Sequence, residues 1–105
     1  MAWMYLLLAA VCEISWPVGL KLAQGPGRAT FGLVLAGVGM AASGWLLYLA
    51  QRQIPMGTAY AVWTGIGAAG TFGLGVAFFG DPASLPRFAG VALIVAGVVT
   101  LKLAP

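Results

Sequence analysis

The sequence predicts an all-α membrane protein built from four transmembrane helices. Of its 105 residues, 62% are hydrophobic and only 7% are charged, whereas soluble domains carry about 25% charged residues. The apolar residues fall into four runs, and each run is close to the ~20 residues that a helix needs to cross the hydrocarbon layer. Because only short loops separate these runs, we expect residues 1–105 to form a single domain.

Clusters of Gly, Pro and polar residues mark the ends of the four runs. The first run stops at the turn cluster 24–28, the second at 51–55, and the third before Gly80-Asp81-Pro82. Such clusters interrupt helices because Gly is conformationally free and Pro lacks an N–H. The expected helices cover about residues 2–22, 30–50, 56–79 and 85–103.

Composition excludes several classes of function. The net charge of +3 comes from five basic and two acidic residues scattered along the chain, so there is no basic patch for a nucleic acid. The single cysteine, Cys12, cannot form an internal disulfide, and histidine is absent. No spacing of residues indicates a metal site. We therefore expect no metal, no cofactor and no enzymatic activity.

The orientation of the chain in the membrane is weakly specified. One side of the membrane would hold Lys21, Arg28 and Arg87, and the other Arg52 and Lys102. This difference gives only a small bias under the positive-inside rule. Both orientations can then coexist, and two copies of opposite orientation could pair as an antiparallel dimer with inverted symmetry. The alternative is one fixed orientation decided during insertion.

Two stripes of small residues indicate helix association. Four helices can form a compact bundle, but they scarcely enclose a gated cavity around one acid. Small residues let membrane helices approach closely, and we expect the third helix to pack inside the bundle and the fourth to carry much of the dimer contact. The stripes are Gly57, Ala61, Gly65, Ala69, Gly73 and Ala77 in the third run, and Ala89, Gly90, Leu93, Ala96 and Gly97 in the fourth.

Glu13 is the only acidic residue inside an apolar run. At a rise of about 1.5 Å per residue it lies roughly 18 Å along the first helix, a little past the middle of a layer about 30 Å thick. A carboxylate at that depth costs at least ~2.5 kcal/mol, so it is a candidate functional residue. The structural alternative is a chance acid that snorkels outwards or is buried as a protonated hydrogen-bond donor.

The neighbours of Glu13 in the sequence suit a binding role. Trp16 follows three residues later, so the two side chains share a face of the helix. Pro17 follows at the fourth position, and its missing N–H would free the Glu13 carbonyl and weaken the helix there. Trp16 lies too deep in the layer to be comfortable as an interfacial anchor.

Further candidates lie on the second and third helices. Tyr60 and Trp63 share a face of the third helix, and Ser43 is a hydroxyl in the second. An acid and aromatic faces together hold an organic cation in a dry site, the one by charge and the other by the ring quadrupole. Tyr60 and Trp63 could instead belong to an interfacial aromatic belt, and Ser43 could bond its own helix backbone.

The sequence as a whole resembles a known family. The length, the four segments, Glu13 with Trp16 and Lys21, and the stretch Pro-Met-Gly-Thr-Ala-Tyr-Ala-Val-Trp-Thr-Gly-Ile-Gly at 55–67 are similar to the small multidrug resistance family over nearly the whole chain. Within the family, Trp16, Ser43, Lys102 and the Thr-Gly-Ile-Gly-Ala run at 64–68 resemble the guanidinium-exporter subtype. Ser15, Pro17 and Asp81 depart from the usual pattern, and the first two leave the exact substrate open.

The resemblance implies an antiparallel dual-topology homodimer in the bacterial inner membrane, surrounded by lipid. Both copies of Glu13 would share one central site and bind either the cation or a proton. Trp16, Ser43, Tyr60 and Trp63 would line this site, with Trp16 and Ser43 hydrogen-bonding towards the carboxylate. The role of Lys102 is left open.

The expected function is proton-coupled antiport that exports guanidinium or small substituted guanidinium cations such as guanylurea. The alternative within the same class is export of hydrophobic quaternary ammonium or aromatic cations, which Trp and Tyr walls would serve equally well. Two other classes are a non-transporting assembly subunit and a proton or cation channel.

Overall fold

The computed structural model describes all of residues 1–105 as four helices joined by short loops. Each helix is long and apolar enough to cross a membrane, which confirms the predicted all-helical class with four spans. Each helix end lies within one residue of its expected position. The helices are α1 (Ala2–Ala23), α2 (Ala29–Gln51), α3 (Met56–Phe78) and α4 (Leu85–Leu103).

The loops form where the sequence stops supporting a helix. Gly27 and Gly80 each have a φ of 71°, a left-handed conformation that glycine adopts without steric cost. Pro55 precedes α3 with an extended ψ of 140°, and α4 begins with a proline in its first turn, where a missing N–H has no intrahelical partner to lose. Each reversal therefore has a local cause in the sequence.

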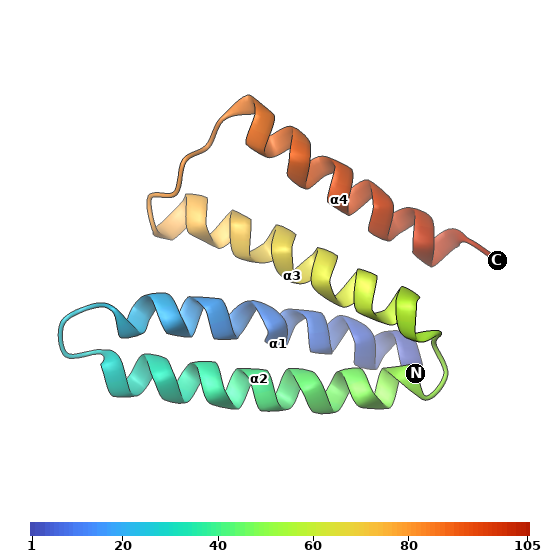
Figure 1. Cartoon of the computed structure of the whole chain (residues 1–105), viewed down its shortest axis with the longest axis horizontal. Helices are drawn as coiled ribbons and strands as arrows, with labels where there is room; N and C mark the ends of the chain where they lie inside the picture. The colour runs from blue at the N-terminus through green and yellow to red at the C-terminus, as the bar shows by residue number, and fades with distance from the viewer.

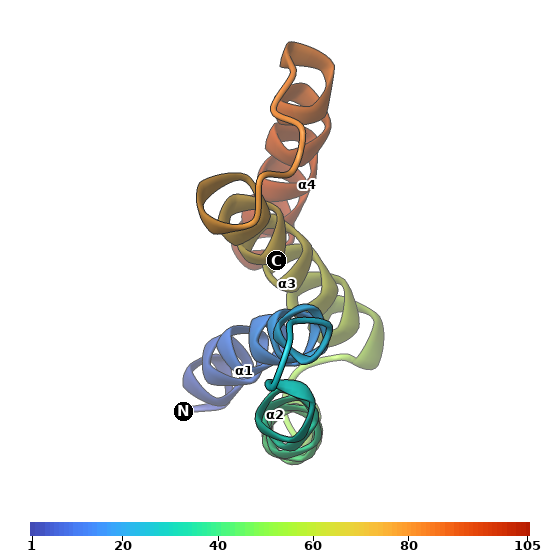
Figure 2. The same cartoon turned by 90° about the vertical axis from the view of Figure 1, so that its left-hand side faces the viewer.

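The four helices form an open row rather than a compact bundle. In Figures 1 and 2 the order across the row is α2, α1, α3, α4. The pairs α1–α2 and α3–α4 are antiparallel, whereas the adjacent helices α1 and α3 run parallel. The chain measures 48 × 34 × 16 Å. A single chain is therefore more open than the compact bundle that four helices can form. Both termini and the α2–α3 loop lie together at one set of helix ends. The α1–α2 and α3–α4 loops lie together at the opposite set of helix ends (Figure 1).

The closest helix approach is between α1 and α2, and it depends on glycines. A Cβ added to Gly32 would collide with the backbone of α1 at Gly19 and Ala23, and one added to Gly39 would collide with the Ser15 side chain. Only glycine permits backbones to approach this closely. This contact was not among the stripes identified in the sequence.

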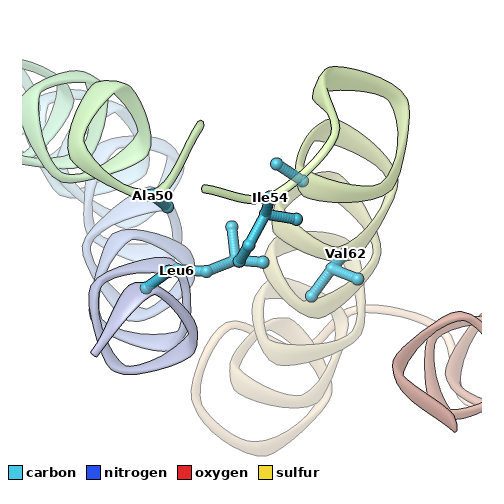
Figure 3. Close-up of a cluster of buried hydrophobic side chains, with 6 residues drawn as sticks. Leu6, Ala50, Ile54 and Val62 are labelled. Carbon is cyan, nitrogen blue, oxygen red and sulfur yellow. The ribbon is translucent and has the colours of Figure 1, made fainter. Parts of the chain in front are cut away.

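A small hydrophobic cluster anchors the start of α3 against the other helices. Figure 3 shows the side chains of Leu6 of α1 and Ile54 of the α2–α3 loop between Ala50 of α2 and Val62 of α3, all in one buried cluster. All four are buried, with Leu6, Ala50 and Val62 fully so. The cluster fixes where α3 leaves the α2–α3 loop, and it thereby sets which face of α3 meets α1.

The predicted small-residue stripe of α3 makes only part of the expected contacts. Gly65 is buried against Val98 and Ile94 of α4, whereas a Cβ added to Gly57 or Gly73 would meet nothing within 4 Å. On α4 no residue is buried, and the five residues of its small-residue ridge are all exposed. The outer face of α4 therefore has no partner within its own chain.

Candidate functional site

Glu13 lies on the face of α1 that packs against α3. A Cβ placed on Gly67 of α3 would lie 2.6 Å from the Cγ of Glu13, so the close approach of the two helices at this level requires a glycine. The side chain is partly buried and borders a cavity of about 230 Å³. The cavity is lined by Glu13, Pro17, Thr64, Gly67, Ala68 and Thr71.

Trp16 holds one oxygen of this carboxylate. Its indole Nε1–H donates to Oε1 of Glu13 over 2.6 Å, as the spacing of three residues along the helix allows. A carboxylate has about four acceptor positions on its two oxygens. The indole therefore orients the group and leaves most of its hydrogen-bonding capacity open to other donors.

Ser43 makes a different contact from the one expected. Its buried hydroxyl donates to the carbonyl oxygen of Ala9 on α1 over 2.7 Å and accepts a hydrogen bond from Nε1 of Trp63 on α3, also over 2.7 Å. The hydroxyl thus bonds neither its own helix nor the Glu13 carboxylate of its own chain. The expected hydrogen bond from Ser43 to the carboxylate is not formed in this structure.

The two hydrogen bonds from Trp63 to Ser43 and from Ser43 to Ala9 form a relay between the three helices. This relay ends at Ala9, one helical turn before Glu13. In an α-helix the carbonyl of Ala9 is also the acceptor for the backbone N–H of Glu13, four residues later. One carbonyl therefore connects α2 and α3 to the segment of α1 that carries the acid. The relay fixes the position of Glu13 relative to both neighbouring helices.

The aromatic candidates separate into inner and outer groups. The Tyr60 ring lies 5.4 Å from that of Trp63 at a tilt of 49°, and Tyr60 is 56% exposed. Trp45 and Tyr48 of α2 stack on each other at 5.3 Å and are exposed on the outside of the row. Trp63 therefore belongs to the helix interfaces, whereas Tyr60 borders an open surface.

The structure brings the predicted residues together in two adjacent sets. Glu13 and Trp16 form the first, and Ser43, Trp63 and Tyr60 form the second, nearer the N-terminal end of α1. Sequence reasoning missed Thr71, which borders the Glu13 cavity. Its spacing of seven residues from Thr64 places both on one face of α3, and this periodicity could have revealed it.

Lys102 lies away from the acid. Its Nζ is 4.6 Å from the centre of the Trp3 ring, a cation–π contact between the C-terminal turn of α4 and the first turn of α1. Lys102 therefore connects the two ends of the chain and takes no part in the Glu13 cavity.

Four helices of membrane-spanning length, with the Glu13 carboxylate in the cleft between α1 and α3, define a small multi-pass membrane protein with an acidic site between its helices. Residues 1–94 match the family described as Small Multidrug Resistance protein. The chain belongs to the small multidrug resistance family and is a multi-pass protein of the bacterial inner membrane.

Relatives of known name cover essentially the whole chain. A guanidinium exporter of Yersinia pseudotuberculosis is 49% identical over 104 residues, which is 99% of each chain. A guanidinium exporter of Proteus vulgaris is 43% identical over the same share. One of Escherichia coli is 44% identical over 103 residues, which is 98% of this chain and 97% of the relative.

Proposed function

We propose that this protein is a proton-coupled antiporter that exports guanidinium and small substituted guanidinium cations such as guanylurea. The observation that carries the proposal is the Glu13 carboxylate, which borders the cleft between α1 and α3 with one oxygen held by Trp16. A planar guanidinium donates two parallel N–H bonds to such a carboxylate. The names of the relatives support the same substrate class.

Hydrogen bonding favours guanidinium over a quaternary ammonium ion. Trp16 bonds one oxygen of the Glu13 carboxylate, and the remaining acceptor positions can take N–H groups of a guanidinium. A quaternary ammonium ion has no N–H to donate, so it would leave these positions without a donor. This argument ranks guanidinium above hydrophobic quaternary ammonium cations.

Coupling follows from competition for one carboxylate. A proton on Glu13 removes the charge that attracts the cation, and a bound cation stabilises the deprotonated form. The two cannot occupy the group together, so a proton gradient drives the cation in the opposite direction. Trp16, Ser43, Tyr60 and Trp63 act as lining or positioning groups around this exchange.

We further propose that the working unit is an antiparallel homodimer of dual topology. A single chain is an open row in which only 16 of 105 residues are buried, so it does not enclose Glu13 by itself. The exposed small-residue ridge of α4 would supply the contact between copies. Pairing of opposite orientations would place two Glu13 side chains around one central site.

Solid-supported-membrane electrophysiology on reconstituted protein tests the function. Guanidinium and guanylurea should evoke transport currents, and a tetraalkylammonium series should evoke much smaller ones. Glu13→Gln keeps the size of the side chain and removes its charge and exchangeable proton, so its currents should vanish while the dimer still forms. Currents that persist in Glu13→Gln, or that are equal for tetraalkylammonium ions, would contradict the proposal.

A further inference from the structure

Three cavities join into one groove that runs along α4. The backbone of α4 comes close to that of α3 alone, and the groove lies between α4 and α1 with α3 as its floor (Figure 1). The cavities have volumes of about 330, 270 and 270 Å³. The first two share Ile66, Val98 and Val99, and the last two share Trp3 and Lys102. Because each cavity opens into the next, they form one continuous space, which we call the α4 groove.

The α4 groove is apolar along its length and polar at one mouth. From Ile14 to Leu7 of α1 its walls are Val, Ile, Leu, Ala and Gly residues, without a polar side chain. At the mouth the lining residues include Gln53, Thr58 and Lys102. The mouth lies at the helix ends that hold both termini and the α2–α3 loop (Figure 1). In a membrane these ends reach the polar interface, so the groove has the polarity of one lipid molecule.

The length of the apolar part matches one leaflet of a bilayer. Between Trp3 and Ile14, α1 rises about 16 Å at 1.5 Å per residue. Half of a hydrocarbon layer about 30 Å thick is roughly 15 Å. An acyl chain that starts at the interface beside Trp3 would therefore end near the level of Ile14.

Lys102 is a cation without an acidic side chain beside it. Its Nζ lies 4.6 Å from the centre of the Trp3 ring, which attracts the ammonium group by its face and holds it at the mouth. Glu13 lies in the α1–α3 cleft, and Asp81 lies in the α3–α4 loop at the opposite helix ends (Figure 1). The N–H groups of Lys102 that point away from the ring can therefore bind an external anion.

Other donors surround Lys102 at the mouth. Gln53 contributes a side-chain amide and Thr58 a hydroxyl, and both groups donate hydrogen bonds. α3 also begins beside the mouth, after Pro55, and no side chain caps its first N–H groups. The positive end of the helix dipole adds to the charge of Lys102. This set of donors suits the phosphate of a lipid headgroup.

The groove uses the face of α4 that is opposite its small-residue ridge. Its α4 residues Val95, Val98, Val99 and Lys102 follow the spacing i, i+3, i+4 and i+7 of a single helix face. At 100° per residue this face lies about half a turn from the ridge within 89–97. A second copy that packs on the ridge would therefore leave the groove open to lipid.

We propose that the α4 groove binds one anionic phospholipid of the phosphatidylglycerol type. Its headgroup phosphate lies at Lys102, and one acyl chain lies along the apolar part between α1 and α4. The lipid connects two helices whose backbones make no close contact with each other. The site is separate from the Glu13 cleft and does not depend on the proposed antiport function.

Native mass spectrometry of the purified protein in detergent tests the headgroup site. Dioleoyl phosphatidylglycerol and dioleoyl phosphatidylethanolamine are titrated separately, and the fraction of chains with one bound lipid gives an apparent Kd for each. Phosphatidylglycerol should bind about fivefold more tightly, the effect of one basic residue near an anionic headgroup. Lys102→Gln should abolish this preference and Lys102→Arg should keep it. The control Arg28→Gln, in the exposed α1–α2 loop, should also keep it.

Filling the groove tests the position of the acyl chain. Val99 borders both apolar cavities and is 50% exposed, so Val99→Phe should occupy the groove without disturbing a buried core. It should weaken the binding of both lipids by about fivefold, because packing contacts drive association in an apolar medium. The control is Val38→Phe on α2, where the valine is 64% exposed, and it should bind both lipids as the wild type does.

Several outcomes would overturn the proposal. Equal Kd values for the two lipids, or the same loss of preference in Arg28→Gln as in Lys102→Gln, would refute the headgroup site at Lys102. Unchanged lipid binding in Val99→Phe would place the lipid elsewhere, and a lost dimer with unchanged lipid binding would assign the groove to a second copy of the chain. Displacement of the lipid by an equal concentration of glycerol phosphate would assign the mouth to a free phosphate compound.

Discussion

The carboxylate of Glu13 is constrained from three directions, each by a different chemical group. Trp16 bonds one oxygen, the missing side chain of Gly67 lets α3 approach, and the Ser43 hydroxyl bonds the carbonyl one turn earlier in α1. Trp16 satisfies only part of the hydrogen-bonding capacity of the carboxylate, so acceptor positions stay open to a further donor. The three contacts hold the carboxylate in one position, where we propose that a proton or a cation binds.

The proposed competition between proton and cation at Glu13 predicts how cation binding depends on pH. As the pH rises, fewer carboxyl groups hold a proton, so the apparent guanidinium affinity should increase by about tenfold per pH unit for each proton displaced. It should reach a plateau once Glu13 is fully deprotonated. Isothermal titration calorimetry across a pH series measures this directly. A pH-independent affinity would mean that proton and cation do not share the carboxylate.

The hydrogen bond from Trp63 to Ser43 leads to a second prediction, which concerns the effect of Trp63 on guanidinium binding. Trp63→Phe keeps an aromatic ring but leaves Ser43 without the indole donor, so the relay to Ala9 weakens by about 1 kcal/mol. Guanidinium binding should fall by a corresponding factor of about five. The control is Trp45→Phe, because Trp45 is 61% exposed on the outside of α2. Equal effects from both substitutions would show that the aromatic residues were assigned to the wrong surfaces.

Among the elements, α1 is the helix on which the site depends. It contacts α2 through Gly19, Gly32 and Gly39 and contacts α3 through Gly67 and Gly70, where added Cβ atoms would meet backbone or side chains of the facing helix. Without a hydrophobic driving force between membrane helices, such close packing is a main source of association. Glycines therefore fix the level at which Glu13 meets α3.

Gly32 offers a direct test of the α1–α2 contact. Gly32→Ala places a methyl group against the backbone of α1, and overpacking of this kind costs about 1–3 kcal/mol. The thermal midpoint of the purified protein in detergent should fall. Gly37→Ala on the same helix should leave it unchanged or slightly raised, because a Cβ there meets nothing within 4 Å. A midpoint equally low for both would place the close contact elsewhere.

At the scale of the whole molecule, the fold leaves charge nearly balanced between its two ends. The α1–α2 and α3–α4 loops lie at one end, with Lys21, Arg28 and Arg87 in or beside them, and Arg52 and Lys102 lie near the other end. So small a difference in basic residues gives little preference for one orientation. The exposed outer face of α4 is then available for a second copy of the chain in the opposite orientation.

Labelling from the two sides of the membrane tests this dual topology. In a Cys12→Ala background, Gln53→Cys puts the only thiol in the exposed α2–α3 loop. A membrane-impermeant reagent should reach about half of the protein from each side, as expected where basic residues give no bias. Labelling of all the protein from a single side would refute the dual-topology proposal, and the antiport function would then need another symmetry.

The sequence by itself determined the four spans, their bounds and the acid at the middle of the first. These follow from local rules: apolar length sets a span, Gly and Pro end it, and a carboxylate inside it stands out because its burial is costly. The residues 55–67 also carried the resemblance to the family to which the chain belongs. The roles of Glu13 and its lining residues remain predictions.

Only the tertiary structure decided how the helices meet, because each helix is apolar on all sides. With no polar face to mark the outside, periodicity could not show that the chain forms an open row, or that Gly32 rather than the stripe of α3 makes the closest contact. The same ambiguity hid the true partners of Ser43 and the position of Thr71. Those depend on the rotation of α3 about its axis, which packing against α1 sets and no local pattern encodes.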